Sequence, residues 1–463
     1  MSRHACPETT PIRRPSPRST NGDPAEIGTG RHPASHKLSE AVQTATRSYN
    51  MPVIEEFFSR RLGLFIHWGL YAIPGWQEQH QLRLKVPRAD YARLAEKFNP
   101  TAFDPDTWID LAQAAGMTYL VFTTKHLDGF CQWDTETTDF KVTQTPFMRD
   151  VLAELATACQ RRGMPLGLYF SAIDQHSPFY PNRGLGHDLA GPEPGDTPNW
   201  DRFVDYMERQ LRELCTRYGK LAMFWWDGGT EIGLPAPHLN QLIRTLQPGI
   251  LINNRGLSDD GDFRTPERDF NPEFDKQPRF SSPVEACQAV GAESWGWRTD
   301  EDYFSDRYLL GEIDRVLARG GNYLLNVGPR SDGVIDPESA RILKTIGLWQ
   351  ESIRESMTDV ETVENISTEP AVPVTRRGNT LYLHLHRPLQ VRRLLLTNVK
   401  TLPERALLLN DGRTICCSTE LLPWRHRTGE RPLRLCNLPV NEYANSVMVL
   451  KLDFAPGVLP QEK

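Results

Sequence analysis

The residues best suited to chemistry lie in the stretch LAMFWWDGG, at positions 221–229. An unbroken apolar run from Leu221 to Trp226 ends in the carboxylate of Asp227, and two glycines follow. An apolar run of this length indicates a strand buried on both faces, as a parallel sheet requires. In a (β/α)8 barrel, active-site groups sit at the carboxyl ends of such strands. Asp227 is therefore a candidate nucleophile; the alternative is a turn-capping residue, because Asp-Gly is a common turn dipeptide.

A partner acid for Asp227 is available later in the chain. Glu267, in RTPER, and Glu285, in PVEAC, lie one βα unit further on, where either could fold over the same pocket. Retaining glycosidases use two carboxyl groups ~5–5.5 Å apart, one to attack the anomeric carbon and one to protonate the leaving oxygen. The acid needs a raised pKa, which an aromatic pocket supplies by disfavouring the charged form.

Two other chemistries are disfavoured by the spacing of their residues. A metal site is the competing use of His67, His126, His176 and Asp227, but these histidines come from different strands and the chain has no HExxH or HxH motif. Serine chemistry lacks the GxSxG elbow. We therefore expect no metal.

Buried strands alternate with helices through most of the chain. The candidate strands cover 62–69, 118–130, 165–171, 221–229, 250–256, 293–297 and 322–329. Between them, Asp104 and Asp150 are suited to cap helices that end at Gly116 and Gly163, and further helices are predicted at 200–219, near 303–319 and at 337–356. This rhythm predicts a parallel α/β architecture. We expect a (β/α)8-like TIM barrel; a doubly wound open sheet is the alternative, but no Gly-rich phosphate loop opens a helix.

The composition divides the chain into three predicted parts. Residues 1–45 are rich in Pro, Ser, Thr, Arg and Gly, which predicts a disordered tail. Residues 46–358 hold the predicted barrel, whose connection at 177–198 is long enough to suggest a functional insertion. Residues 359–463 contain short alternating segments divided by Pro, Gly and Asn, which predict a C-terminal antiparallel β-sandwich.

Charge and hydropathy exclude several kinds of partner. The 463 residues carry a formal charge of −6, and this gives no basic surface for nucleic acid. The chain has no 18-residue apolar span and no secretory leader pattern, so we expect no membrane partner and a cytoplasmic protein. The 8 cysteines lack zinc-ligand spacing and are typical of thiols in a reducing compartment. The sequence leaves a homo-oligomer open.

Polar side chains gather where the candidate strands end. A purely structural protein has no reason to concentrate such groups on one face of a barrel, so this clustering indicates an enzyme. The residues concerned are His67, His126, Asp174, Asp227, Arg255, Glu293 or Trp295, and Asn326.

Eight motifs, in order and near the expected spacing, resemble the α-L-fucosidases of glycoside hydrolase family 29. They are FFSRRLGLFIHWGLYAIPGW, TTKHLDGFCQWDT, GLYFS, FWWDGG, INNRG, RTPE, SWGW and GNYLLNVGPRSDG, within roughly residues 48–360. The resemblance implies a barrel followed by a β-sandwich, and exo-acting hydrolysis of terminal α-L-fucosides by retaining double displacement. It further implies no metal and no organic cofactor, and a fucosylated oligosaccharide or glycoconjugate as the partner.

Taken residue by residue, the resemblance implies Asp227 as the nucleophile. It implies Glu267, in the TPE motif, as the first choice for the acid/base and Glu285 as the second. Trp225 and Trp226 would wall the pocket beside the nucleophile. The positions that match the lining of the sugar pocket are His67, Glu78, His126, Arg255 and Trp295.

Three positions depart from the pattern of that family. Leu127 stands where a second histidine is usual, Gln79 where an aromatic residue is usual, and Phe170 where a second tyrosine often stands. A lost neutral hydrogen bond to a sugar hydroxyl costs ~0.5–1.5 kcal/mol, so selectivity for the sugar is open. The alternatives are a glycosidase for a related L-sugar, such as an α-L-galactoside, and a catalytically weak carbohydrate-binding protein.

Overall fold

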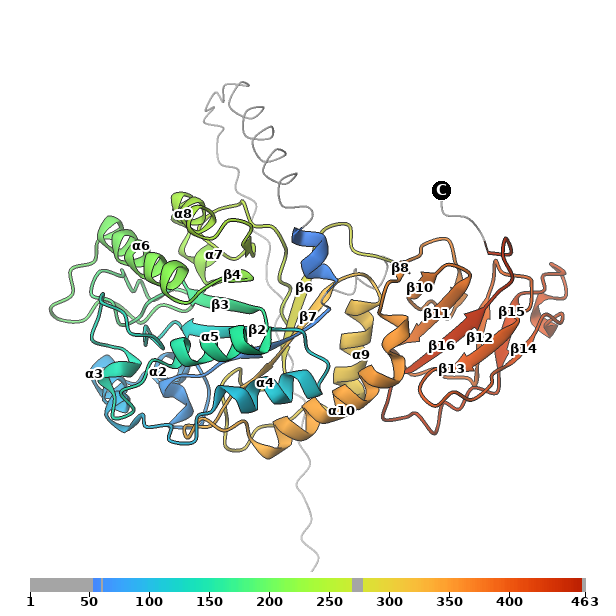
Figure 1. The fold of residues 1–463 in the computed structure, drawn as a ribbon, viewed down its shortest axis with the longest axis horizontal. Coiled ribbons are helices and arrows are strands. Elements are labelled where there is room, and N and C mark those ends of the chain that lie inside the picture. Colours follow the sequence, from blue (N-terminus) through green and yellow to red (C-terminus); the bar gives the residue numbers. More distant parts are fainter. Residues whose placement is uncertain (1–52, 60, 269–277, 460–463) are drawn as a thin grey trace, which may run out of the picture. The chain divides into compact units, whose positions relative to one another are not determined.

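The computed structural model describes residues 53–59, 61–268 and 278–459, which are coloured in Figure 1. The predicted tail at 1–45 lies outside the described residues. Within the coloured part of the chain, no helix has the length and apolar character needed to cross a bilayer.

A parallel sheet of seven strands forms the centre of the amino-terminal region (Figure 1). The strand order is β5-β4-β3-β2-β1-β7-β6. The bounds are β1 Leu62–Ile66, β2 Tyr119–Lys125, β3 Leu166–Ser171, β4 Met223–Asp227, β5 Leu251–Ile252, β6 Glu285–Ala289 and β7 Asn322–Val327. The strands predicted around β1–β5 and β7 are confirmed. The strand predicted at 293–297 is wrong, because β6 comes earlier, in the sequence EACQA, which has no apolar run to reveal it.

An irregular segment, residues 263–267, lies between β5 and β6. It is joined to both sides by isolated parallel bridges, which are Asn253–Phe263, Arg264–Val284 and Glu267–Cys287. Pro266 sits inside this segment and has no N–H to donate, so a continuous ladder cannot form there. The architecture is therefore the predicted (β/α)8-like barrel, with its eighth strand reduced to three bridges.

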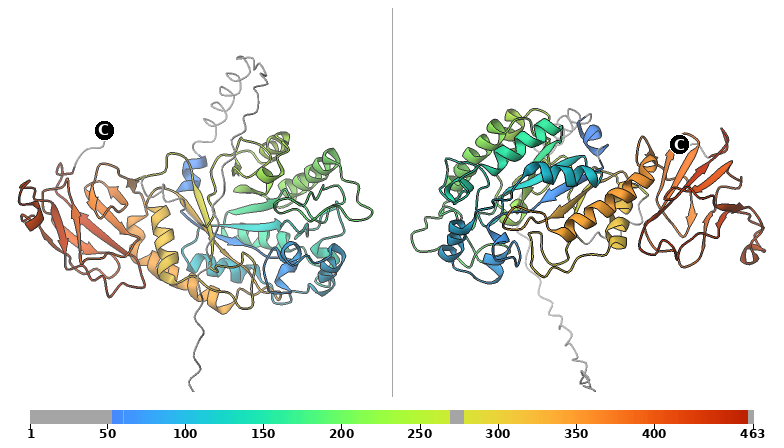
Figure 2. Two further views of the ribbon diagram at one scale, coloured as in Figure 1. Left: turned by 180° about the vertical axis from the view of Figure 1, so that it is seen from behind. Right: turned by 60° about the horizontal axis from the view of Figure 1, so that its bottom comes forward.

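Helices follow the strands and lie outside the sheet (Figures 1 and 2). The Asp104 side chain accepts from the backbone N of Asp106 at 3.0 Å, and Asp150 accepts from Ala153 N at 2.8 Å, so both predicted caps are confirmed. The longer helices are α4 Pro105–Ala114, α5 Val151–Arg162, α6 Trp200–Arg217, α8 His238–Leu246, α9 Asp306–Leu317 and α10 Pro337–Ile353. The shorter ones are α2 His80–Arg83, α3 Arg88–Ala92 and α7 Gly229–Ile232.

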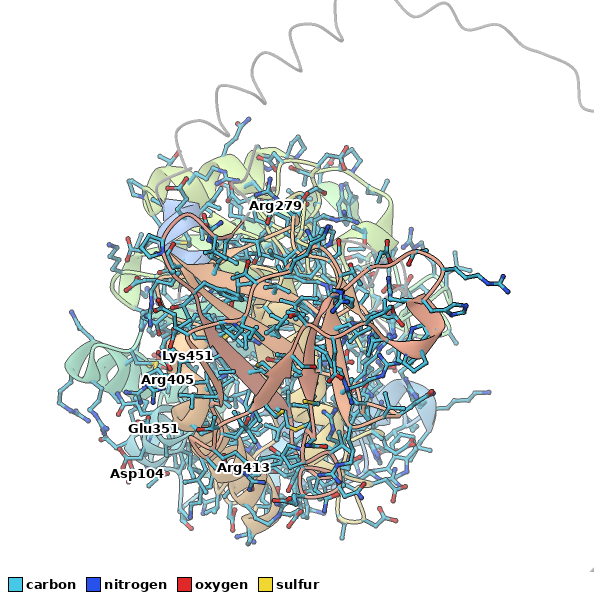
Figure 3. The ribbon with its side chains drawn as sticks, turned by 90° about the vertical axis from the view of Figure 1, so that its right-hand side faces the viewer. Asp104, Arg279, Glu351, Arg405, Arg413 and Lys451 are labelled. Atoms are coloured by element: carbon cyan, nitrogen blue, oxygen red, sulfur yellow. The ribbon has the colours of Figure 1, made fainter. Side chains whose placement is uncertain are left out.

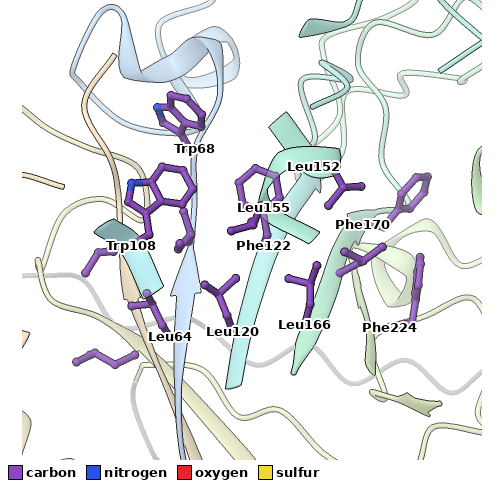
Figure 4. Packing of buried hydrophobic residues seen from close by; sticks show 14 of the residues in the cluster. Leu64, Trp68, Trp108, Leu120, Phe122, Leu152, Leu155, Leu166, Phe170 and Phe224 are labelled. Carbon is purple, nitrogen blue, oxygen red and sulfur yellow. The ribbon is translucent and has the colours of Figure 1, made fainter. Parts of the chain in front are cut away.

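Alternation along the strands separates two apolar layers. One layer packs the outer face of the sheet against the helices; its members include Leu64, Leu120, Phe122, Leu166, Phe224, Trp108 of α4, and Leu152 and Leu155 of α5 (Figure 4). The other layer fills the barrel interior and includes Phe65, Tyr119, Tyr169, Trp225 and Leu324. A residue's parity along its strand thus decides whether it faces the helices or the barrel interior.

Two antiparallel sheets form the carboxyl-terminal region, which confirms the predicted β-sandwich. Their orders are β13-β16-β11-β10-β8 and β14-β15-β12-β9. Arg405 and Lys451, labelled in Figure 3, belong to the neighbouring strands β13 and β16. The bounds are β8 Glu361–Thr362, β9 Thr368–Glu369, β10 Val374–Arg377, β11 Thr380–Leu385, β12 Arg393–Leu396, β13 Arg405–Leu408, β14 Cys416–Ser418, β15 Leu433–Cys436 and β16 Met448–Asp453.

Gly63, in β1, leaves room for the Tyr119 ring inside the barrel. A Cβ at position 63 would lie 2.3 Å from that ring. We expect Gly63→Ala to lower the free energy of unfolding by ~1–3 kcal/mol, because overpacking shifts the ring and the backbone. Urea unfolding measures the change. Gly191→Ala, with no atom within 4 Å of the new Cβ, is the control and should stay within ~0.5 kcal/mol of wild type; equal stability of Gly63→Ala and wild type would contradict the packing.

Candidate active site

A pocket opens at the carboxyl ends of the parallel strands. Its volume is about 610 Å³, counting the space open to solvent. His67 follows β1, His126 follows β2, Ser171 ends β3 and Asp227 ends β4, and all four line the pocket. This is the end at which (β/α)8 enzymes carry their active sites.

The Arg255 side chain joins two carboxylates and is itself held firmly. Its Nη1 donates to Asp227 Oδ1 at 3.2 Å and to Glu267 Oε2 at 2.8 Å. Its Nε donates to Thr265 Oγ1 at 2.9 Å and its Nη2 to the Thr265 carbonyl at 2.8 Å. The guanidinium also lies 4.9 Å from the centroid of the Trp225 ring. Because both carboxylates reach one nitrogen, the two accepting oxygens are no farther apart than those two bond distances added together.

Asp227 is kept ionised by its neighbours. Tyr169 Oη donates to Asp227 Oδ2 at 2.7 Å, on the other oxygen from Arg255. Burial raises the pKa of Asp227, but the charge of Arg255 and the bond from Tyr169 outweigh it and hold the pKa below its usual range. A carboxylate that stays charged at neutral pH can act as a nucleophile.

Two neutral imidazoles line the pocket beside Asp227. Burial lowers the pKa of His67 well below its usual value, and burial lowers the pKa of His126 to about 4. His67 Nδ1 lies 2.7 Å from Asn326 Oδ1. An amide oxygen only accepts, so Nδ1 carries the proton and Nε2 is left as an acceptor. Such a ring suits the hydroxyl of a sugar.

Glu78 organises the segment predicted to be a strand at 293–297. Its Oε2 accepts from the backbone N of Trp295 at 2.9 Å and of Gly296 at 3.4 Å, and from Ser294 Oγ at 3.1 Å. Glu78 is buried, and burial raises its pKa. The segment is therefore a loop wrapped around a carboxylate, which sets the Trp295 ring 5.2 Å from the ring of His67.

Most of the predicted site residues meet in this pocket. The lining includes His67, Glu78, His126, Asp227, Arg255, Glu267 and Trp295. The departures Gln79 and Leu127 also line it, so both can affect which sugar fits.

Trp226 lies outside the pocket, which corrects the prediction that it lines the site. Asp227 and Trp225 face the barrel interior, so the residue between them on β4 faces the helices. There, Trp226 Nε1 donates to Asn240 Oδ1 at 2.8 Å. The period of two along a strand is the signal that separates the two tryptophans.

The same alternation on β3 identifies a residue that the motifs did not single out. Tyr169 faces the interior and reaches Asp227, whereas Phe170 packs outward against Trp226 at a ring distance of 5.6 Å. The change from tyrosine at Phe170 therefore leaves the pocket lining intact.

Glu285 lies inside the barrel rather than over the pocket, contrary to the expected placement. It is the first residue of β6, at the opposite end of that strand from the pocket, and it is fully buried. It accepts from Tyr119 Oη at 2.6 Å and from Trp225 Nε1 at 3.0 Å. Burial raises the pKa of Glu285 to about 7, but its contacts are those of a residue that positions Trp225.

Of the residues in the metal alternative, His67, His126 and Asp227 line the pocket, whereas His176 lies outside its lining. His176 stacks on Phe140 at a ring distance of 3.9 Å. In the described ranges, no three His, Cys, Asp or Glu side chains gather as a metal site.

The predicted insertion at 177–198 contributes one residue to the pocket, His187. Its Nδ1 lies 2.7 Å from Glu231 Oε2, and Glu231 also lines the pocket. Neither residue was predicted from the sequence, because their pairing depends on how two connections meet in space.

A (β/α)8-like barrel with two carboxylates at one arginine on its carboxyl-terminal rim has the layout of a glycoside hydrolase. A family model described as "Alpha-L-fucosidase" matches residues 31–355. The chain therefore belongs to the α-L-fucosidase family.

Individual relatives agree with this assignment. The chain is 27% identical over 371 residues to the tissue alpha-L-fucosidase of Bos taurus, covering 73% of this chain and 76% of that protein. The structure of alpha-L-fucosidase isoenzyme 1 from Paenibacillus thiaminolyticus matches with a TM-score of 0.76 and 32% identity, covering 87% of this chain and 99% of that one. A third match is the structure of a family 29 α-L-fucosidase from Bacteroides thetaiotaomicron, trapped as a covalent intermediate with 2-fluoro-fucosyl fluoride by use of a glutamate-to-glutamine mutant. Its TM-score is 0.70 and its sequence identity is 26%, and the match covers 87% of this chain and 96% of that one.

The raised pKa of Glu285 makes stability depend on pH. Burial raises this pKa to about 7 in the folded protein from an ordinary 4.5, so the buried, protonated form stabilises the fold below pH ~4.5 and this contribution is lost as pH rises through ~7. Glu285→Gln removes the titration while keeping a hydrogen-bonding amide. We expect the stability of the variant relative to wild type to rise by about 2–3 kcal/mol between pH 4.5 and 8.

Urea unfolding of both proteins across that pH range measures this difference. If the difference in free energy of unfolding between the two proteins did not change with pH, the raised pKa of Glu285 would be contradicted. Glu361→Gln, on an exposed position of β8, is the control and should show no such trend.

Proposed function

We propose that the protein is a retaining exo-glycosidase that hydrolyses terminal α-L-fucosides through a covalent glycosyl-enzyme intermediate. The observation that carries the proposal is that Arg255 Nη1 donates to both carboxylates, to Asp227 Oδ1 at 3.2 Å and to Glu267 Oε2 at 2.8 Å. Inverting enzymes keep their carboxyl groups ~6.5–9.5 Å apart to leave room for a water, and retaining enzymes keep them ~5–5.5 Å apart. The short separation supports the retaining pair.

In the first step, Asp227 attacks the anomeric carbon. The bond from that carbon to the glycosidic oxygen breaks as the bond to an Asp227 oxygen forms, and Glu267 gives its proton to the leaving oxygen. Tyr169 and Arg255 hold the nucleophile in place before attack, which limits the reorganisation needed in the transition state.

In the second step, water cleaves the ester. Glu267, now a carboxylate, takes a proton from the water while the water oxygen bonds to the anomeric carbon and the Asp227 oxygen leaves. Two inversions return the starting configuration. The side chain of Glu267 is 38% exposed, so water can reach it once the leaving group has gone.

The lining of the pocket supports an L-fucosyl group as substrate. Neutral His67 and His126 and the carboxylate of Glu78 suit sugar hydroxyls, while the apolar side chains of Leu127 and Ile173 suit a deoxy sugar, which has fewer hydroxyls to satisfy. The relatives named above are α-L-fucosidases. A hydroxyl placed against an apolar wall loses its water partners, so an α-L-galactoside is the less favoured substrate.

Removing the nucleophile should abolish turnover. We expect Asp227→Ala to lower kcat on para-nitrophenyl α-L-fucoside by at least ~10³-fold, because the covalent step is lost. Added azide should restore release of para-nitrophenol and yield a fucosyl azide. Sugar binding that persists in both proteins without wild-type turnover would instead favour the carbohydrate-binding alternative, and turnover of para-nitrophenyl α-L-galactoside alone would favour the related L-sugar.

The acid/base role of Glu267 predicts a dependence on the leaving group. We expect Glu267→Gln to lower kcat/KM by ~10²–10⁴-fold on a fucoside of a poor leaving group, such as an alkyl alcohol, and less on an aryl fucoside that needs no proton. Glu285→Gln is the matched comparison, and it should affect the two substrates equally. If Glu285→Gln gave the larger leaving-group effect, the roles proposed for the two glutamates would be wrong. Proton NMR of the first-formed anomer tests retention directly.

A further inference from the structure

A histidine–carboxylate pair lines the pocket but takes no part in the two proposed steps. His187 lies in the long connection between β3 and α6, and Glu231 lies in α7, directly after the strand that ends in Asp227. His187 Nδ1 is 2.7 Å from Glu231 Oε2.

The pair stands at the open side of the pocket. The side chains of His187 and Glu231 are 36% and 44% exposed, whereas His67 and His126 are only 4% and 7% exposed. A terminal sugar must enter far enough to bring its anomeric carbon to Asp227. The group attached to that carbon extends back toward solvent, so the exposed pair is placed to meet the leaving group.

The connection that carries His187 is fixed at its beginning. The Asp174 side chain accepts from the backbone N of His176 at 3.1 Å and of Ser177 at 2.8 Å. Asp174 also forms a fully buried ion pair with Lys125 Nζ at 2.9 Å. A buried, hydrogen-bonded pair of this kind holds the start of the connection against the end of β2.

The remainder of the connection is fixed as well. Gln175 Nε2 donates to the His187 carbonyl at 2.7 Å, and Arg183 Nη1 donates to the Ile232 carbonyl at 3.0 Å, next to Glu231. Arg88 binds both oxygens of Asp196 at 2.7 and 2.9 Å. The two members of the pair are therefore held before a ligand arrives, which reduces the entropy lost on binding.

The chemistry of the pair matches adjacent hydroxyl groups. With Nδ1 bonded to Glu231, the Nε2 of His187 is left to donate or accept, and the carboxylate of Glu231 accepts from an O–H. The bond to Glu231 raises the pKa of His187, and the charged ring donates more strongly. The neighbouring wall residues Leu127 and Ile173 offer no hydrogen bond.

We propose that His187 and Glu231 form a binding site for the sugar on the leaving-group side, which makes the enzyme prefer α-L-fucosides of a hydroxyl-rich sugar to those of a simple aryl alcohol. This inference rests on the function proposed above. It assigns the two residues to substrate selectivity and not to bond cleavage.

The test compares leaving groups. For each protein, kcat/KM is measured with para-nitrophenyl α-L-fucoside and with α-L-fucosyl disaccharides of a hexose in 1→2, 1→3, 1→4 and 1→6 linkage, and the ratio of the best disaccharide to the aryl substrate is taken. We expect His187→Ala and Glu231→Gln each to lower this ratio about tenfold, the effect of one lost charge-assisted hydrogen bond. The double variant should lower it little further, because the pair acts as a unit.

His238→Ala is the matched control. His238 Nε2 lies 4.0 Å from Glu208 Oε2, in a histidine–carboxylate pair outside the pocket lining, so its removal should leave the ratio unchanged. Equal losses on both substrates in His187→Ala, or no change in the ratio, would overturn the inference.

Failure of the proposed function is seen separately, in wild type. If wild type hydrolyses no α-L-fucoside, the proposed function fails, and the inference is then tested by calorimetric affinity for the same disaccharides. About tenfold weaker binding to His187→Ala than to wild type would uphold the leaving-group site, and equal affinity would overturn it.

Discussion

The pocket depends on one guanidinium placed between two carboxylates. The charge of Arg255 lowers the pKa of the buried Asp227 and keeps that carboxylate ionised. Arg255 also donates to Glu267, and its own position is set by the two hydrogen bonds that it donates to Thr265 and by its contact with the Trp225 ring. Thr265 and Glu267 both belong to the segment that closes the barrel. The contacts that close the barrel therefore also position Arg255 and the second carboxylate.

The barrel interior supports the pocket from below. Glu285 accepts from Tyr119 and Trp225, and the Trp225 ring stacks on Tyr169 at 5.6 Å and 21°. Tyr169 in turn donates to Asp227. Buried polar groups that are fully paired fix one arrangement of side chains, since each unmade bond would be costly in a low dielectric. A carboxyl group far from the chemistry thereby fixes the direction in which the nucleophile points.

Apolar runs and helix caps made much of this fold predictable. The strands around β1–β5 and β7, the caps at Asp104 and Asp150, and the β-sandwich follow from local pattern. The closing segment 263–267 and β6 were missed, because a proline breaks the first and polar residues fill the second. In the site, Asp227 and His67 could be predicted because each stands at the end of an apolar run. The alternation of side chains along β4 could also have shown that Trp225, and not Trp226, faces the pocket. His187 could not be foreseen, since its partner lies in another connection.

The closing segment, residues 263–267, carries part of the active site and is bridged to its neighbours at isolated positions. Isolated bridges join it to its two neighbours, at Asn253 after β5 and at Val284 and Cys287 beside and within β6. Parts of a protein held by fewer hydrogen bonds open at lower free energy than the whole. Opening here would carry away a carboxylate and the anchor of Arg255 together, while the helical layer and both sandwich sheets stay folded. The integrity of this one wall, and not only the stability of the whole fold, therefore decides whether Arg255 and the two carboxylates stay together.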